Sequence, residues 1–273
     1  MLVDLHVHSH HTPGCALTPR DLVRRAKAAG LDALALTDVN TLEGLAELRE
    51  AAREESFPAL AGVEITTDHG HYLCFFPEPE QLPALPQVFG TTPWPVREVL
   101  RFVQEKGGVA VAAHPYDKTV DRPSGDFIFT VEGLSAIQGL CGRAKPAAND
   151  LAVEAADHMN LPCVAGSGAH GSLDEVGTVA TLFREPVSSE RDLVAQIRAG
   201  GVYCVAIGAP PRPPEPRDHG PRRDHGERRG GERGGRRGGD RGGRGGGERG
   251  GRRGGDRGGR GGRGPRGGGG GRR

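Results

Sequence analysis

Short apolar runs alternate with stretches of helical periodicity through the first 208 residues of the 273-residue chain. Runs of about four to eight apolar, often β-branched residues predict buried strands, and apolar residues recurring every three or four positions predict amphipathic helices. The predicted strands cover residues 2–8, 32–38, 59–66, 71–76, 108–113, 134–140, 162–165, 178–183 and 201–206. The predicted helices cover residues 18–29, 41–53, 96–106, 147–158 and 189–199. Strands joined by helices indicate a mainly parallel sheet, and about seven such units in one domain favour a closed or distorted α/β barrel over an open sheet.

Capping residues indicate where the first two predicted helices begin and where the first one ends. Thr18 is the expected N-cap of the first helix, with Pro19 in its first turn and Gly30 closing it. Asn40 is the expected N-cap of the second helix, because Glu43 follows three residues later, as in a capping box.

Side chains that can bind metals lie in or directly after several of the predicted strands. His6 and His8 are separated by one residue in the first strand, so both imidazoles project from the same face. Asp38, Glu64 and His114 fall near the carboxyl ends of three other strands. In a barrel of parallel strands the carboxyl ends lie on one face, where functional groups gather. We therefore expect these residues to meet at one site.

The residue types at this site suit a metal centre for phosphate-ester hydrolysis, which uses imidazole nitrogens and carboxylate oxygens and often bridges two ions with one carboxylate. We expect His6 and His8 to hold one ion, Glu64 to bridge, and His71 and His114 to hold the second. Alone, His114 also fits a strand-end residue, Glu64 a helix cap or salt-bridge partner, and His71 an exposed strand residue. Their repetition at strand ends favours metal binding.

The near-neutral total charge of +1 hides two oppositely charged parts. Residues 209–273 contain 20 arginines and 8 acidic residues, a net charge of +12, whereas residues 1–208 carry 16 basic and 27 acidic residues, a net −11. This asymmetry predicts one folded acidic domain over residues 1–208 and a basic interaction tail over residues 209–273. The tail is rich in Pro and Arg-Gly-Gly units, and residues 231–246 recur unchanged as 247–262. With almost no apolar residue to bury, the tail is expected to be disordered.

Cysteine use and hydropathy indicate the compartment. The five cysteines are widely spaced and form no Cys-x-x-Cys pair, which argues against a disulfide framework or a thiolate zinc site. No apolar run reaches about 18 residues, and the first residues lack a basic region followed by an apolar stretch. We therefore expect a cytoplasmic protein with no secretory signal and no membrane span.

The order of the motifs resembles that of the polymerase and histidinol phosphatase (PHP) domain family, across nearly all of residues 1–208. The motifs are Asp4-Leu5-His6-Val7-His8, Thr37-Asp38-Val39, Gly62-Val63-Glu64, His71, Ala113-His114-Pro115 and Gly166-Ser167-Gly168-Ala169-His170. The resemblance implies a distorted (β/α)7 barrel with a two- or three-metal centre and the hydrolysis of phosphomonoesters or nucleotide ends. The metal ligands it implies are His6, His8, Glu64, His71, His114 and His170. We expect two divalent ions, of manganese, zinc or iron, as cofactors.

Three departures from the family pattern reduce the expected site. Val39 stands where the family usually has a histidine, and Gly168 where it has an aspartate. Pro13-Gly14 occupies the region that usually gives an aspartate or histidine. The missing positions belong largely to a third metal, and Gly168 also removes a ligand from the first. His170 is then left as a lone third-site residue.

Other polar residues near the motifs are candidates for roles beside the ligands. His10, His11 and His69 are candidate replacement ligands, although a solvated turn is the favoured interpretation of His10 and His11. Asp4 and Asp38 are the candidate catalytic carboxylates. Asp4 precedes the first histidine by two residues, so it faces the same side and is expected to orient an imidazole as a hydrogen-bond acceptor.

Three functions stay open. The leading one is a metal-dependent phosphoesterase that uses metal-activated water on phosphate esters of nucleotides or nucleic-acid ends, with the tail raising the local substrate concentration. The second is a catalytically impaired PHP-like domain that binds RNA or another single-stranded nucleic acid through the tail, since flexible guanidinium groups pair with phosphates and stack on bases. The third is a phosphatase of small phosphomonoesters whose tail is only a solubilising extension.

Overall fold

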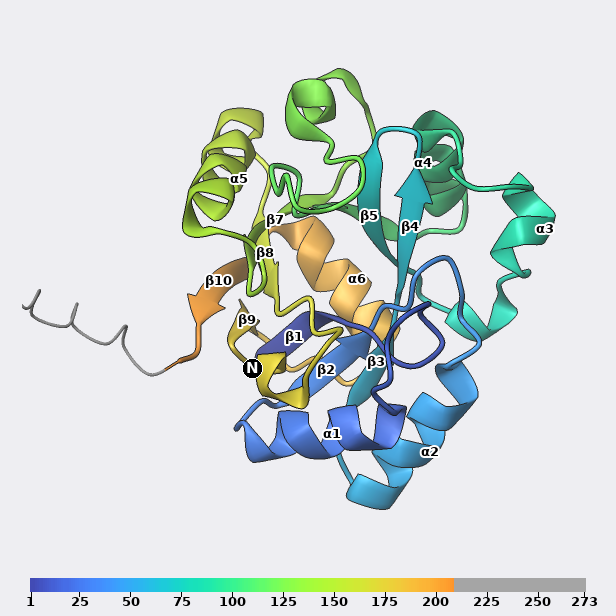
Figure 1. The fold of residues 1–273 in the computed structure, drawn as a ribbon, viewed down its shortest axis with the longest axis vertical. Coiled ribbons are helices and arrows are strands. Elements are labelled where there is room, and N and C mark those ends of the chain that lie inside the picture. Colours follow the sequence, from blue (N-terminus) through green and yellow to red (C-terminus); the bar gives the residue numbers. More distant parts are fainter. Residues whose placement is uncertain (209–273) are drawn as a thin grey trace, which may run out of the picture. The chain divides into compact units, whose positions relative to one another are not determined.

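The computed structural model describes residues 1–208, drawn as the coloured ribbon in Figure 1. The predicted basic tail and its predicted disorder, over residues 209–273, lie outside the described residues. Helices and strands alternate through residues 1–208, which confirms the mixed α/β class. None of the helices in this part of the chain is both long and apolar enough to cross a membrane.

The strands of residues 1–208 pair into two five-stranded sheets. The first has the order β10-β9-β1-β2-β3 and the second the order β4-β5-β6-β7-β8. The strands are β1 (Leu2–Val7), β2 (Ala33–Leu36), β3 (Ala59–Ala61), β4 (Val63–Thr67), β5 (Gly70–Phe75), β6 (Val109–Ala113), β7 (Ala136–Cys141), β8 (Cys163–Gly166), β9 (Val179–Phe183) and β10 (Val202–Ala206).

Helices connect most of these strands, and five of the α-helices correspond to predicted ones. The α-helices are α1 (Pro19–Ala28), α2 (Leu45–Glu55), α3 (Leu85–Phe89), α4 (Val96–Glu105), α5 (Pro146–Met159) and α6 (Glu190–Ala199), of which α3 was not predicted. Short 3-10 helices cover Pro79–Gln81, Gly125–Thr130 and Leu173–Glu175. Thr18 caps α1 as predicted, because its hydroxyl oxygen accepts the backbone N–H of Asp21 at 3.1 Å.

The directions of the strands differ from the predicted mainly parallel sheet. β1, β2 and β3 run parallel, as do β6, β7 and β8. In contrast, β5 is antiparallel to both β4 and β6, and β9 is antiparallel to both β1 and β10. The turn at Asp68 and His69 joins β4 to β5, and so short a connection permits only an antiparallel pair. The prediction of a mainly parallel sheet is therefore wrong.

Isolated bridges join the two sheets near the predicted site. Val7 at the end of β1 bridges Ala169 after β8, and Val39 after β2 bridges Glu64 in β4. The backbone N–H of His8 donates to the carbonyl of Ala169 at 2.9 Å. The carboxyl ends of β1, β2 and β8 therefore converge with β4, while the distorted (β/α)7 barrel stays a prediction.

Gly62 breaks the strand that the sequence predicts over residues 59–66. β3 ends before it and β4 begins after it, and the two strands belong to different sheets. A Cβ atom at position 62 would lie 2.5 Å from Cε1 of Phe75, closer than any side chain tolerates. Glycine therefore allows the close approach of Phe75 at the point where the chain passes from one sheet to the other.

The second helix begins later than predicted. Its N-cap is Gly44, without a side-chain hydrogen bond, so the predicted capping box at Asn40 and Glu43 is wrong. Asn40 adopts a left-handed backbone with φ of 59°, and its side-chain oxygen accepts the backbone N–H of Thr66 at 2.8 Å. Asparagine tolerates this conformation better than most residues. Asn40 thus fastens the loop after β2 to β4 instead of starting the helix.

Candidate metal centre

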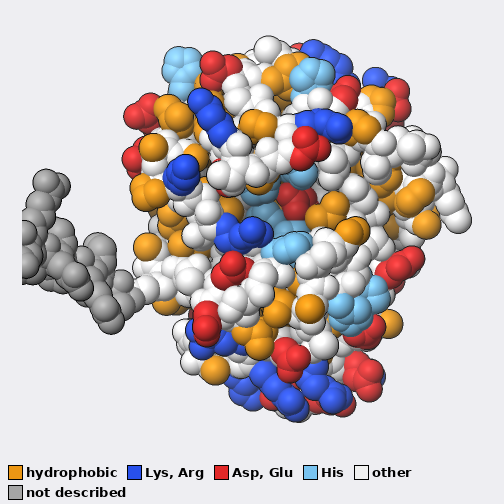
Figure 2. Space-filling view, in the orientation of Figure 1, with side chains coloured by type: hydrophobic (Ala, Val, Ile, Leu, Met, Phe, Trp, Pro, Cys, Tyr) orange, Lys and Arg blue, Asp and Glu red, His pale blue; other side chains and the backbone are white. Residues whose placement is uncertain are grey.

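A cavity of about 330 Å³ opens where strands of both sheets end. All six predicted metal ligands line it: His6, His8, Glu64, His71, His114 and His170. The space-filling view in Figure 2 shows a hollow with histidine side chains and an acidic side chain at its floor. Residues spread over most of the domain sequence are thus brought to one place.

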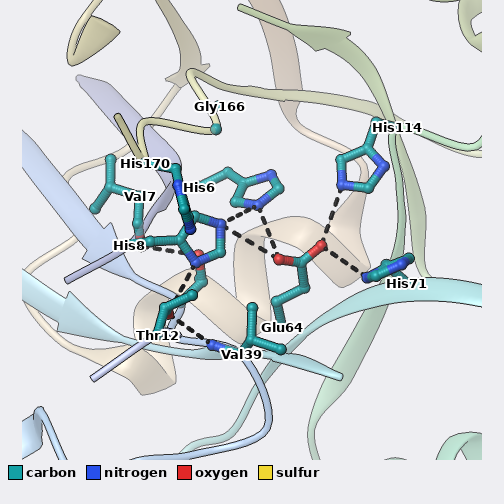
Figure 3. Close-up of polar contacts among 12 residues, drawn as sticks. His6, Val7, His8, Thr12, Val39, Glu64, His71, His114, Gly166 and His170 are labelled. Atoms are coloured by element: carbon teal, nitrogen blue, oxygen red, sulfur yellow. Dashed lines mark hydrogen bonds and ion pairs between the residues drawn. The ribbon is translucent and has the colours of Figure 1, made fainter. Parts of the chain in front are cut away.

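The carboxylate of Glu64 lies between two pairs of imidazoles (Figure 3). Its Oε2 lies 3.4 Å from Nε2 of His6 and 3.3 Å from Nε2 of His8. Its Oε1 lies 3.3 Å from Nδ1 of His71 and 3.1 Å from Nε2 of His114. Glu64 is 4% exposed, so water screens these contacts little.

The pair formed by His6 and His8 fits a tetrahedral metal ion. Ligand atoms about 2.1 Å from such an ion lie about 3.4 Å apart. The two Nε2 atoms are 3.0 Å apart, and each lies at a similar distance, 3.3–3.4 Å, from Oε2 of Glu64. Three protein ligands leave a fourth position for water or substrate, which is typical of catalytic rather than structural sites.

The pair formed by His71 and His114 offers a second donor set. Nε2–H of His71 donates to the carbonyl of Asp121 at 2.8 Å, so a neutral ring turns the lone pair of Nδ1 toward Oε1 of Glu64. Among the described residues, this buried Nδ1 has no hydrogen-bond partner. A lone pair facing a carboxylate oxygen is repulsive unless a proton or a cation lies between them. Nε2 of His114 faces the same oxygen, but the three ligand atoms do not all lie within 4.8 Å of one another, so a second ion here stays a prediction.

Burial and charge set the protonation states of the ligands. Burial lowers the pKa of His8 to about 3 against the opposing charge of Glu64, so this imidazole is neutral near pH 7. Burial alone would raise the pKa of Glu64, but the surrounding imidazoles hold it well below its usual range. Burial likewise disfavours the charged form of His71, yet its contacts with Glu64 raise the pKa of His71 above the ordinary value. A divalent metal binds an ionised carboxylate and a neutral imidazole, so an ion beside His71 has to displace the proton that Glu64 favours there.

Thr12 fixes which nitrogen of His8 faces the cavity. The single proton of the Thr12 hydroxyl is donated to Oδ1 of Asp38 at 2.7 Å. The hydroxyl oxygen of Thr12 accepts the backbone N–H of Val39 at 3.0 Å and lies 3.3 Å from Nδ1 of His8. Because the hydroxyl has no second proton, Nδ1 of His8 carries the hydrogen of that contact. Nε2 of His8 is therefore left with its lone pair for a metal.

Gln138 has the same role for His6, and the sequence analysis missed it. Its Oε1 lies 3.2 Å from Nδ1 of His6 and accepts the backbone N–H of His114 at 3.1 Å. Its Nε2 donates to the carbonyl of Gly166 at 3.0 Å. An acceptor at Nδ1 leaves the lone pair of Nε2 for a metal. The signal in the sequence was a single amide side chain within the apolar strand β7.

Asp4, one of the two predicted catalytic carboxylates, lies behind the cavity and not in its lining. Its oxygens accept the backbone N–H groups of His6, Ser167 and Gly177 at 3.2, 2.8 and 3.1 Å. These donors are backbone amides, so the expectation that Asp4 orients an imidazole is wrong. Asp4 instead holds β1 to the segments after β8 and before β9.

Asp38, the other predicted catalytic carboxylate, also lies outside the cavity lining. In addition to Thr12, it accepts the N–H and the O–H of Ser9 at 2.6 and 2.7 Å. Asp38 therefore holds the loop after β1 in place and is connected to His8 through Thr12.

Comparison with known protein families adds a further observation to this geometry. The sequence model of the PHP domain matches residues 4–166, more than half of the chain, and a model described as PHP-associated matches residues 146–202. The chain belongs to the PHP family.

Curated relatives match parts of this PHP chain. An uncharacterized protein of Methanocaldococcus jannaschii is 30% identical over 142 residues, which cover 48% of this chain and 77% of that protein. A 5'-3' exoribonuclease of Haemophilus influenzae is 45% identical over 65 residues, 24% of this chain and 23% of the enzyme. A 3',5'-nucleoside bisphosphate phosphatase of Chromobacterium violaceum is 43% identical over 70 residues, 26% of this chain and 24% of the enzyme. The chain thus spans less than a quarter of the length of either named enzyme.

Two solved structures resemble the PHP fold seen here. A two-domain protein of Bacteroides vulgatus that contains a predicted PHP-like metal-dependent phosphoesterase has a TM-score of 0.59 at 17% identity, covering 76% of this chain and 65% of that one. An amidohydrolase of Chromobacterium violaceum, solved with sulfate and without metal, has a TM-score of 0.52 at 21% identity, covering 76% and 98%. These likenesses show the fold alone. The PHP family match and the phosphatase relative support a metal-dependent phosphoesterase in general.

The departures from the PHP pattern lie in the lining of the cavity. Pro13, Val39 and Gly168 line it where the family pattern has ligand side chains. His170 also lines it, with Nε2 3.4 Å from the carbonyl of Pro13 and its ring 5.7 Å from that of His8. In residues 1–208, no group of three ligand side chains around one point includes His170.

The candidate replacement ligands lie away from the PHP site. Neither His10 nor His11 lines the cavity; their Nε2 atoms lie 3.5 and 3.0 Å from Oε1 of Glu47 on α2. His69 stacks on Phe127, with the ring centroids 3.8 Å apart. None of the three replaces a missing ligand.

Arg143 is a second residue that the sequence analysis missed. It is the only arginine or lysine among the described residues that line the cavity. Its Nη1 lies 3.4 Å from the carbonyl oxygen of Gly168, and its side chain is half exposed. A guanidinium group binds phosphate oxygens in a bidentate manner. No motif surrounds Arg143, so only the fold reveals its place.

Thr12→Val is expected to weaken metal binding about 10- to 100-fold, the usual effect of losing a group that orients a metal-binding histidine. Valine keeps a similar volume but removes the oxygen beside Nδ1 of His8. Competition with a chromophoric chelator measures the change. Thr12→Ser keeps the hydroxyl and should bind metal nearly as the unmodified protein does. An equal loss in both variants would contradict the role of the hydroxyl.

Proposed function

We propose that the protein hydrolyses phosphate esters of nucleotides or nucleic-acid ends at a centre of two divalent ions. The observation that carries this proposal is the buried Glu64 carboxylate, each oxygen of which faces two imidazole nitrogens at 3.1–3.4 Å. Divalent ions in such a setting polarise phosphoryl oxygens, lower the pKa of water and stabilise the leaving oxygen.

The residues around the ligands position them for this reaction. Thr12 and Gln138 keep the cavity-facing nitrogens of His8 and His6 unprotonated, since each supplies an oxygen at Nδ1. We assign Asp4 and Asp38 to positioning, not to contact with substrate, because their hydrogen bonds hold the strand and loop that carry these histidines. Arg143 would bind phosphate oxygens at the cavity and keep the ester oriented.

The nature of the relatives and of the cavity favours a nucleotide-type substrate. The partial relatives named above act on a nucleoside bisphosphate and, as an exoribonuclease, on RNA. A cavity of about 330 Å³ is at the lower end of the sizes that hold small ligands, about 300–1,000 Å³. It has room for a phosphoryl group and part of its leaving group, while the rest extends outward. A terminal phosphate fits this shape better than an internal phosphodiester.

Phosphate release from defined substrates tests the proposal. The full chain, loaded with Mn²⁺, is assayed on a nucleoside monophosphate, a nucleoside 3',5'-bisphosphate and a short 5'-phosphorylated RNA. Activity should require the metal and fall to background in His8→Ala. A chain that holds two ions but releases no product from any of the three substrates, or one whose activity His8→Ala leaves unchanged, would contradict the proposal.

Arg143→Gln is expected to raise KM for the preferred phosphate ester about 10- to 100-fold, because a charge-assisted hydrogen bond contributes about 1.5–3 kcal/mol. Arg143→Lys keeps the charge without the bidentate geometry, so its KM should lie between those of the unmodified protein and Arg143→Gln. Steady-state kinetics measure the effect, with the exposed Arg101→Gln on α4 as a control. An unchanged KM in Arg143→Gln would remove this residue from phosphate recognition.

The missing family ligands and the basic tail favour a second candidate, an impaired PHP domain that binds RNA through residues 209–273. Val39 and Gly168 motivate it within the described residues. Metal analysis separates the candidates, because an active centre of this kind holds two ions per chain. If the protein is active, deletion of residues 209–273 should reduce turnover on RNA ends but leave that on small phosphomonoesters unchanged.

A further inference from the structure

A second group of potential metal ligands lies outside the PHP cavity, on the surface near α2. His10 and His11 follow β1, and Glu47 lies in the first turn of α2. The Nε2 atoms of His10 and His11 lie 3.5 and 3.0 Å from the same oxygen, Oε1 of Glu47. One ligand atom from each residue lies within 4.8 Å of the other two.

The backbone around the two histidines holds them in this position. The N–H of His10 donates to the carbonyl of Leu17 at 2.8 Å, and the N–H of Thr12 donates to the carbonyl of Ser9 at 2.8 Å. The ring of His11 packs on Gly44, where an added Cβ would lie 3.1 Å from its Cδ2 atom. The imidazole rings lie with their centroids 4.4 Å apart. Ordering two imidazoles in advance reduces the entropy lost when they bind an ion.

Glu47 differs from the other glutamates of α2 in its partners. Glu54 and Glu55 pair with Arg20 and Arg24 of α1. Among the described residues, Glu47 has ion-pair contacts with imidazoles alone.

We propose that His10, His11 and Glu47 form a surface site for a transition-metal ion, separate from the PHP centre. The spacings of 3.0 and 3.5 Å bracket the distance of about 3.4 Å between ligands of a tetrahedral zinc ion. Two imidazoles favour Zn²⁺, Ni²⁺ or Cu²⁺ over Mn²⁺, which prefers oxygen ligands. His10 and Glu47 are 39% and 48% exposed, so solvent completes the coordination of the ion.

Zinc titration of the full, metal-stripped chain tests this site, with the chelator-competition endpoint giving the ions bound per chain. Glu47→Gln and His11→Gln should each bind one Zn²⁺ fewer than the unmodified protein, or bind that ion at least about tenfold more weakly. Their Mn²⁺ content at the PHP centre should not change. Glu50→Gln on the same helix and His69→Gln are the matched controls and should titrate as the unmodified protein does.

Cobalt gives an independent readout of the same site. Tetrahedral Co²⁺ absorbs visible light more strongly than hexa-aqua Co²⁺, and the difference spectrum between the unmodified protein and His11→Gln isolates the surface ion. We expect a tetrahedral band in this difference. Equal zinc endpoints and affinities in all variants, together with a featureless difference spectrum, would overturn the proposal. Loss of Mn²⁺ from the PHP centre in Glu47→Gln would also overturn the proposal, because the two sites would then not be separate.

Discussion

Glu64→Gln is expected to reduce metal-dependent phosphate release at least about 10³-fold, since the ions supply several kcal/mol of charge stabilisation in the transition state. The glutamine amide is neutral, and an NH₂ group that cannot bind a cation replaces one of the two carboxylate oxygens. One pair of imidazoles therefore loses its shared oxygen, either His6 and His8 or His71 and His114. After loading with Mn²⁺ alone, metal analysis should find at most one Mn²⁺ per chain, and kinetics on the same sample should show the loss of turnover.

The exposed Glu98→Gln on α4 removes the same charge away from the cavity and serves as the control. It should keep both ions and full activity. Circular dichroism confirms that the Glu64 variant is folded before metal is counted. Two tightly bound Mn²⁺ ions in a folded Glu64→Gln protein would mean that the carboxylate does not bridge them.

Gly166→Ala is expected to destabilise the domain by about 1–3 kcal/mol, the usual cost of overpacking a well-packed core. An added Cβ would lie 2.5 Å from Cβ and 2.6 Å from the backbone nitrogen of His6, and a backbone atom cannot move aside as a side chain can. The strand β8 would be pushed away from β1, where the N–H of Gly168 now donates to the carbonyl of His6 at 2.7 Å. Urea unfolding measures the stability, and chelator competition should show weaker binding at the ion that His6 holds.

Gly201→Ala is the control for this change, because its Cβ would have no neighbour closer than 3.8 Å, the Cδ atom of Arg184. It should unfold at nearly the same urea concentration as the unmodified protein. If Gly166→Ala unfolds at the same urea concentration as the unmodified protein and keeps its metal affinity, then β8 can shift away from His6 without loss of stability.

The meeting of the predicted ligand residues in one cavity could be foreseen because their signals are local. Alternation along a strand places His6 and His8 on one face, and Glu64 lies in a strand whose apolar neighbours are evident in the sequence. Gln138 could not be placed in the same way, because its partner His6 lies 132 positions away in the chain. Arg143 lies in a loop without a motif, so its place in the cavity lining is visible only in the folded structure.

The errors in the predicted fold also have physical causes. A capping-box pattern at Asn40 and Glu43 considers only neighbours in the chain, whereas the side chain of Asn40 binds the backbone of Thr66 in another strand. The directions of β5 and β9 depend on how the strands pair, and apolar runs say nothing of direction. Tertiary contacts therefore decided both features.

The hydrogen bonds of Asp4 connect β1 to segments of the chain that are synthesised much later. Its acceptor oxygens bind the amides of Ser167 and Gly177, which lie 163 and 173 positions later in the chain. The ribosome therefore releases His6 and His8 long before the segments that secure their strand. A nascent chain that ends before Ser167 already contains five of the six predicted ligands but lacks the amides that hold β1 in place. The contacts of β1 with the segments after β8 can therefore form only once Gly177 has been made, whereas its pairing with β2 needs only the first 36 residues.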